Sequence, residues 1–178
     1  MESFLIALAI FFPAAISNSS PIVASKLKIF RFLDIPIDLR LTVRGKRIFG
    51  DHKTFRGYLV GIVAGASTSY LLFDVAGFPQ LIDSGYSGSA FLFGAVLGFG
   101  ALLGDSIESF FKRQVGVQPG SSWVPFDQID FLIGGCIVVL LFTDVGLLVY
   151  LWIVLIYGLM HPLATIIGYY LGLKQDKI

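Results

Sequence analysis

The chain has 178 residues, of which 56% are hydrophobic and only 14% are charged, and its formal net charge is +1. A soluble domain carries about 25% charged residues, so this composition excludes an ordinary soluble protein and predicts an integral membrane protein. The nearly balanced charge gives no reason to expect a nucleic-acid partner. The single cysteine excludes a disulfide within the chain and a cysteine-based metal site.

Apolar segments alternate with polar connections along the whole chain. They cover residues 3–28, 57–78, 89–111, 129–143 and 146–172. A helix needs about 20 apolar residues to cross a bilayer, and about 17–25 are tolerated. We therefore expect an all-α integral membrane protein with five transmembrane helices, forming a single membrane-embedded domain over residues 1–178. The glycine-rich spans permit a homodimer.

The positions of the basic residues predict the orientation of these helices. All 13 Lys and Arg lie between Lys26 and Arg56, at Lys112 and Arg113, or at Lys174 and Lys177. Basic residues near the ends of spans mark the cytoplasmic side. Five spans with the N-terminus outside put all of them on that side, whereas four or six would not. The C-terminus is then cytoplasmic, as are a basic loop over 29–56 and a second loop over 112–126.

The basic loop contains the pattern GKRIFGDHKTFRG, residues 45–57, in which three glycines alternate with cations. Glycines let backbone N–H groups approach an anion closely, and the cations offset its charge. Topology determination and attraction to anionic lipid are the competing explanation, which accounts for the charges but does not require this pattern. The pattern favours a phosphate-binding loop. Its candidate residues are Gly45, Lys46, Arg47, Lys53, Thr54 and Arg56.

Four carboxylates interrupt the ends of the third and fourth apolar segments. Asp105 and Glu108 are spaced i, i+3, as are Asp127 and Asp130, so each pair shares one helix face. The loop between the two segments is short, which makes them antiparallel neighbours and brings all four acids to one depth near the cytoplasmic face. Ionised groups at membrane depth persist mainly where they face a polar cavity, a partner or a metal.

This acidic group, with Lys112 and Arg113 beside it, is typical of a site for a divalent cation and a phosphate. Oxygen ligands without His or Cys suit Mg²⁺, Mn²⁺ or Ca²⁺ rather than Zn²⁺. Separate structural roles are the alternative. Asp127 and Asp130 would then only stabilise the start of a helix, and the two cations would only extend toward the interface.

The acidic segments resemble a known enzyme family. GDSIESFFKR, residues 104–113, is similar to the G-D-x-x-E-S-x-x-K-R block of the CTP:phosphatidate cytidylyltransferases, also called CDP-diglyceride synthetases. Asp127 and Asp130 match the D-R-x-D element of that family, with Gln128 in the place of its arginine. The short chain and the GDHKTFRG segment look more like the archaeal branch, the CDP-archaeol synthases.

The resemblance implies a nucleotidyltransferase that transfers a cytidylyl group from CTP to a lipid phosphate, requires Mg²⁺ and releases pyrophosphate. In the archaeal branch the acceptor is an isoprenoid ether lipid phosphate, 2,3-bis-O-(geranylgeranyl)-sn-glycerol 1-phosphate, and the product is CDP-archaeol, a phospholipid precursor. We expect the active site at the cytoplasmic side of the cell membrane. The expected metal ligands are Asp105, Asp127 and Asp130, and the expected catalytic set adds Glu108, Lys112 and Arg113.

The expected CTP-binding residues are those of the basic loop, with Lys46, Lys53, Thr54 and Arg56 holding the triphosphate. A cation- or proton-coupled transporter is the alternative function, because intramembrane acids are typical of such proteins. That function predicts carboxylates spread along a path across the bilayer, whereas the four acids of this sequence gather at one end.

Overall fold

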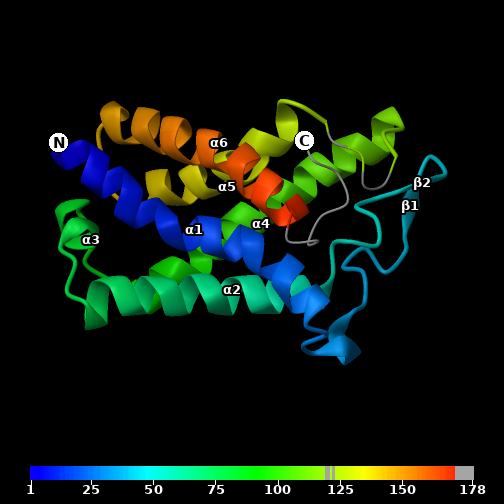
Figure 1. Cartoon of the computed structure of the whole chain (residues 1–178), viewed down its shortest axis with the longest axis horizontal. Coiled ribbons are helices and arrows are strands. Elements are labelled where there is room, and N and C mark those ends of the chain that lie inside the picture. Colours follow the sequence, from blue (N-terminus) through cyan, green and yellow to red (C-terminus); the bar gives the residue numbers. More distant parts are fainter. Residues whose placement is uncertain (119–120, 122, 171–178) are drawn as a thin grey trace.

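The computed structural model describes residues 1–118, 121 and 123–170 (Figure 1). Within them, long helices coincide with the predicted apolar segments. They are α1 (Glu2–Lys26), α2 (Phe55–Ser69), α4 (Ala90–Val115), α5 (Phe126–Phe142) and α6 (Leu147–Tyr170). The prediction of a helical membrane protein is confirmed, because α1, α2 with its extension to Val75, and α4 are long and apolar enough to cross a bilayer. The number of five spans remains a prediction.

Short elements complete the chain. A π-helical turn, η2 (Tyr70–Val75), extends α2, and a single turn, α3 (Gln80–Asp83), precedes α4. Between α1 and α2 lie a 3₁₀ turn, η1 (Arg31–Leu33), and an antiparallel hairpin of β1 (Thr42–Val43) and β2 (Lys46–Arg47). The hairpin was not predicted, because strands of two residues leave no alternating pattern in the sequence.

Local signals fix where the helices begin and end. The Thr54 hydroxyl caps α2 by accepting the Gly57 amide at 3.1 Å, and Ser89 caps α4. Gly116 ends α4 in the left-handed conformation that glycine adopts most easily. Residues 112–115 therefore form the last turn of α4 rather than the beginning of a loop.

The bundle has two chemically different ends. The N-terminus and α3 lie at one end, whereas η1 and the hairpin extend from the other (Figure 1). Every Lys and Arg of the described residues belongs to the hairpin end, in the segments 26–56 and 112–113. The expected basic C-terminal residues Lys174 and Lys177 lie outside the described part of the chain.

The first three long helices pack through small residues. The Ser17 hydroxyl of α1 donates a hydrogen bond to the Gly61 carbonyl of α2, and a side chain at Gly98 of α4 would collide with Ser17. Close backbone approach of this kind is a common way to associate helices in lipid, where burial of apolar surface contributes little. On the other side of α1, the Tyr157 hydroxyl of α6 donates to the Leu8 carbonyl.

Helices α4 and α5 make the closest backbone contact at the hairpin half of the bundle. A Cβ atom at Gly134 would collide with the Gly100 carbonyl, and a Cβ atom at Gly104 would collide with the Asp130 carbonyl. The absence of side chains at these glycines therefore sets the distance between the two helices. Since Asp105 follows Gly104 directly, this contact also determines where the acidic residues meet.

We predict that Gly134→Ala lowers the stability of the protein by about 1–3 kcal/mol, because the added methyl meets backbone that cannot move without separating the helices. Gly158→Ala is the matched control, since it also lies inside a helix but its Cβ would make only an ordinary contact, at 3.7 Å from Leu132. Thermal unfolding in detergent measures both. Equal melting temperatures for the two variants would contradict the proposed role of the α4–α5 contact.

Candidate functional site

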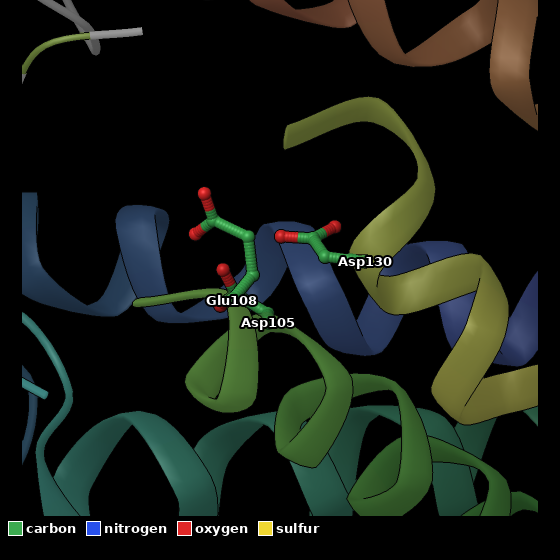
Figure 2. Close-up of side chains that lie close together, drawn as sticks. All are labelled: Asp105, Glu108 and Asp130. Atoms are coloured by element: carbon green, nitrogen blue, oxygen red, sulfur yellow. The ribbon is translucent and has the colours of Figure 1, made fainter. Parts of the chain in front are cut away.

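Three carboxylates converge near the hairpin end of the bundle. Asp105 and Glu108 come from α4, and Asp130 reaches toward them from the start of α5 (Figure 2). One oxygen from each of the three lies within 4.8 Å of the others, which is a suitable arrangement for a shared cation. Glu108 and Asp130 are each only 8% exposed, so neither carboxylate is solvated as a surface group would be.

Two lysines border this acidic cluster, defined as Asp105, Glu108 and Asp130. Lys53 from the basic loop forms an ion pair with Asp105. Lys112, one turn beyond Glu108, contacts Asp127 and lies 3.4 Å from the Glu108 carboxylate. Both lysines are largely buried, with side chains 17% and 13% exposed, so these interactions are screened less than surface ion pairs.

The balance of charge in this group is compatible with a divalent cation. The acidic cluster together with Asp127 supplies four carboxylates, and the two lysines supply two ammonium groups. If all are ionised, two formal negative charges remain in a partly buried site. Like charges packed this closely are unfavourable unless a cation or protons compensate them.

The structure groups the four predicted acids differently from the sequence-based metal set of Asp105, Asp127 and Asp130. The oxygens that lie close together belong to Asp105, Asp130 and Glu108, so Glu108 takes the place predicted for Asp127. Asp127 lies beside Lys112, and its carboxylate accepts the Trp123 amide at 2.8 Å just before α5 begins. Asp127 therefore connects the start of α5 to α4 through Lys112.

Arg113 faces the loop that follows α4. Its guanidinium donates to the Gln118 carbonyl at 3.3 Å, and its side chain passes beside Gly50 of the basic loop. The structure therefore brings Lys112 to the carboxylates and directs Arg113 to the connection between α4 and α5. Arg113 thus contacts both the basic loop, at Gly50, and the loop that follows α4, at Gln118.

The six predicted phosphate-binding residues have different surroundings in the structure. Lys53 reaches the acidic cluster, whereas Lys46 donates to the Gln114 carbonyl in the last turn of α4. Arg56 is buried, 2.9 Å from Asp34 and 3.0 Å from the Ser25 hydroxyl. Thr54 caps α2, and Gly45 occupies the hairpin turn with φ of +75°.

Arg47, the remaining member, is held by Asp38, an acid outside the predicted site residues. Asp38 is 4% exposed and accepts the Arg47 guanidinium at 2.7 Å. It also accepts the amides of Phe49, Gly50 and Arg40 at 3.0, 3.1 and 3.0 Å. Asp38 thus organises the loop from its centre. The one available signal was the position of Asp38, like that of Asp34, among apolar residues in a mainly basic segment.

The pKa of Asp38 reports the strength of these contacts. Burial raises the pKa of the carboxyl, but the hydrogen bonds from Arg47 and from the three amides outweigh burial and hold the pKa at about 2, below its usual value of 3.8. The ionised form is therefore stabilised in the folded loop. Arg47 is in turn held fully charged, since its hydrogen bonds to Asp38 and Asp51 raise its pKa.

The membrane-length helices and the acidic cluster with its lysines define the class: a multi-pass membrane protein with a candidate cation site at one end. The CarS-like family model, described as CDP-archaeol synthase, matches residues 2–177. The chain belongs to this family. It is 37% identical over 153 residues to the CDP-archaeol synthase of Methanoculleus marisnigri, covering 79% of this chain and 87% of that protein.

Further relatives extend the similarity over nearly the whole chain. The CDP-archaeol synthase of Pyrobaculum islandicum is 36% identical over 165 residues, with 92% of each chain covered. A solved structure described as an intramembrane enzyme for archaeal membrane lipid biosynthesis superposes with a TM-score of 0.76. It is 29% identical, and the match covers 92% of this chain and 94% of that one.

We predict that Asp38→Asn lowers the protection of the Phe49 and Gly50 amides against hydrogen exchange by about 30-fold at pH 7, because the shift in pKa from 3.8 to about 2 corresponds to roughly 2 kcal/mol. The folded pKa lies below the unfolded one. The contribution of Asp38 is therefore full above about pH 4 and is lost as the pH falls toward 2.

Asp51→Asn is the control for this measurement. Asp51 binds the same guanidinium at 2.8 Å, but its side chain is 72% exposed, and such a pair contributes about 0–1 kcal/mol. Mass-spectrometric exchange of the loop peptides, corrected for the intrinsic pH dependence, distinguishes the two variants. Equal loss of protection in both would show that Asp38 does not organise the loop.

Proposed function

We propose that this chain transfers a cytidylyl group from CTP to an isoprenoid ether lipid phosphate, forming CDP-archaeol and pyrophosphate. Membership in the CDP-archaeol synthase family is the observation that carries this proposal. The acidic cluster bordered by Lys53 and Lys112 supplies chemistry that such a reaction needs. A transporter is disfavoured by the same membership and by the gathering of these acids at one end of the bundle.

The reaction joins two polyanions. An oxygen of the lipid phosphate forms a bond to the α-phosphorus of CTP, and the bond from that phosphorus to the oxygen bridging the α- and β-phosphates breaks. The electron pair of the broken bond leaves with pyrophosphate. The attacking phosphate oxygen is already ionised near neutral pH, so the protein needs no general base. Its tasks are to position the two phosphates and to offset their charge.

Asp105, Glu108 and Asp130 would hold Mg²⁺, since their oxygens are close together and oxygen ligands suit this ion. When bound, Mg²⁺ supplies positive charge that offsets the phosphates and the developing charge on pyrophosphate. Lys53 and Lys112 each have an ammonium beside this cluster. With a cation on the carboxylates, both ammonium groups would be available to bind phosphate oxygens of CTP or of the lipid. Asp127 would orient Lys112.

The remaining parts of the basic loop would position Lys53. Arg47 and Arg56 hold the loop through Asp38 and Asp34, and Thr54 begins the helix that follows Lys53. We propose five spans with the basic end facing the cytoplasm, as the distribution of Lys and Arg favours. CTP would then reach the site from the cytoplasm, and the lipid phosphate would enter from the inner leaflet.

We predict that Asp130→Asn and Glu108→Gln each reduce turnover at least about 100-fold, because each removes a charge that the site needs to hold Mg²⁺. The assay uses purified protein in detergent with labelled CTP, Mg²⁺ and a dialkyl ether glyceryl phosphate, and it detects the CDP-lipid and pyrophosphate. A chelator should abolish product formation, and added Mg²⁺ should restore it.

Asp83→Asn is the control for loss of an acid, since Asp83 is exposed and belongs to α3, which lies at the opposite end of the bundle. It should retain normal turnover. No CDP-lipid from the unaltered protein with either ether or ester lipid phosphates would refute the proposed reaction. Full activity of Asp130→Asn would refute the assignment of the metal site while leaving the reaction standing.

A separate measurement distinguishes Glu108 from Asp127 as a metal ligand. Mn²⁺ binding, followed by electron paramagnetic resonance without nucleotide, should weaken by about 10-fold or more in Glu108→Gln and by less in Asp127→Asn. The physical reason is that the Glu108 oxygen lies with those of Asp105 and Asp130, whereas Asp127 acts through Lys112. If Asp127→Asn weakened Mn²⁺ binding more than Glu108→Gln, the result would instead support Asp105, Asp127 and Asp130 as the metal ligands.

A further inference from the structure

A groove between the hairpin and α4 lies on a different face of the molecule from the acidic cluster. It is an open cavity of about 530 Å³. Its lining residues are Val43, Arg44, Lys46, Phe110, Phe111 and Gln114. Successive residues of an α-helix are rotated by about 100°, so Phe110 and Gln114 point to the side of α4 opposite to Asp105 and Glu108, whereas Phe111, three residues after Glu108, lies between the two sides. The groove therefore opens mainly on the side of α4 that faces away from the proposed catalytic site.

The hairpin is fixed against α4 in a way that defines the groove. The Lys46 ammonium donates to the Gln114 carbonyl, and the Gln114 side-chain amide donates to the Arg47 carbonyl at 3.4 Å. Both contacts join β2 to the last turn of α4. The groove thus has one wall on the hairpin and one on the helix, held together by hydrogen bonds in both directions.

The floor of the groove continues an apolar ridge on α4 that faces away from the bundle. The ridge residues recur every four positions and therefore lie along one side of the helix. They are Phe99, Leu103, Ile107 and Phe111, with exposed fractions of 45%, 40%, 48% and 53%. In a membrane-spanning helix such a ridge is covered by lipid chains. The groove lies where this lipid-facing ridge reaches the basic end of the bundle.

Cations at the mouth of the groove give it the complementary charge for an acidic headgroup. Arg44 is exposed, and its side chain makes no ion pair or hydrogen bond within the part of the chain that the structure describes. The Lys46 ammonium has three N–H donors, of which the Gln114 carbonyl takes one. The lining contains no carboxylate. A phosphate would therefore find two cations and no competing acid.

We propose that this groove binds an anionic membrane phospholipid that is not the reacting substrate, with its phosphate at Arg44 and Lys46 and its chains along the α4 ridge. The site requires a ligand that is both anionic and long-chained, because its cations and its apolar floor are continuous. A soluble phosphate would use only the mouth, and a neutral lipid would use only the ridge.

The test places a fluorescent reporter on the floor of the groove. F111W is introduced into a W123F/W152F background, so that the indole at this position is the single tryptophan. The protein is reconstituted in phosphatidylcholine nanodiscs that contain equal fractions of either brominated phosphatidylglycerol or brominated phosphatidylcholine. Quenching of the indole reports which lipid lies beside it. We expect brominated phosphatidylglycerol to occupy this position more than brominated phosphatidylcholine does, by about fivefold for each cation that contributes. The preference should fall by about fivefold in R44Q, which leaves the contribution of Lys46.

R40Q is the matched control, since Arg40 is also exposed in the same loop but does not line the groove. It should keep the preference for phosphatidylglycerol. Equal quenching by the two brominated lipids, or equal loss of preference in R44Q and R40Q, would overturn the proposal. Displacement of phosphatidylglycerol by a small fraction of a lipid phosphate monoester would also overturn it, by making the groove part of the substrate path.

A second measurement does not depend on the reporter. Native mass spectrometry of the otherwise unaltered chain should show phosphatidylglycerol retained after detergent washing, with at least about fivefold less retained in R44Q than in R40Q. Equal retention in these two variants would contradict the assignment. Both experiments contain neither CTP nor Mg²⁺, so their outcome is independent of the proposed cytidylyl transfer.

Discussion

The close contact between α4 and α5 is the constraint on which the site depends. Glycines at 100, 104 and 134 allow backbone to meet backbone, and a side chain at 104 would strike the Asp130 carbonyl. Because Asp105 follows Gly104, the distance between the helices and the distance between the carboxylates are set by the same contact. A wider spacing would separate Asp130 from the pair on α4, and the three oxygens would no longer lie together.

This contact also concentrates negative charge, which the remaining parts of the molecule must offset. Lys112 is contributed by α4 itself, whereas Lys53 comes from a loop that follows a different helix. The position of Lys53 depends on the order of that loop, and this order depends on buried Asp38 with Arg47 and on Arg56 with Asp34. Within the basic loop, Arg47 and Arg56 thus hold the loop in place, whereas Lys53 meets the acids.

The sequence predicted the helices well, because each apolar run is long and its ends carry charges or caps that also fix the structure. It predicted that the acids of α4 and α5 would meet, since a short loop leaves two helices few arrangements. It did not predict which oxygens would be closest, because that depends on the rotation of each helix and on contacts such as Gly104 with Asp130. Neither the hairpin nor the role of Asp38 follows from periodicity, since both arise from loop contacts between residues several positions apart.

Helix α4 combines two surfaces that a reaction between a soluble nucleotide and a lipid requires. One side carries the carboxylates and Lys112, and the other carries an apolar ridge that ends at the groove beside Arg44. Both surfaces end in the same last turns, so the carboxylates and the apolar ridge reach the same end of the bundle. The hairpin strengthens this arrangement, because Lys46 binds the end of α4 while Lys53, seven residues later, reaches the acids. Separating the two faces lets the site remain polar without exposing its charges to hydrocarbon, which would otherwise be costly.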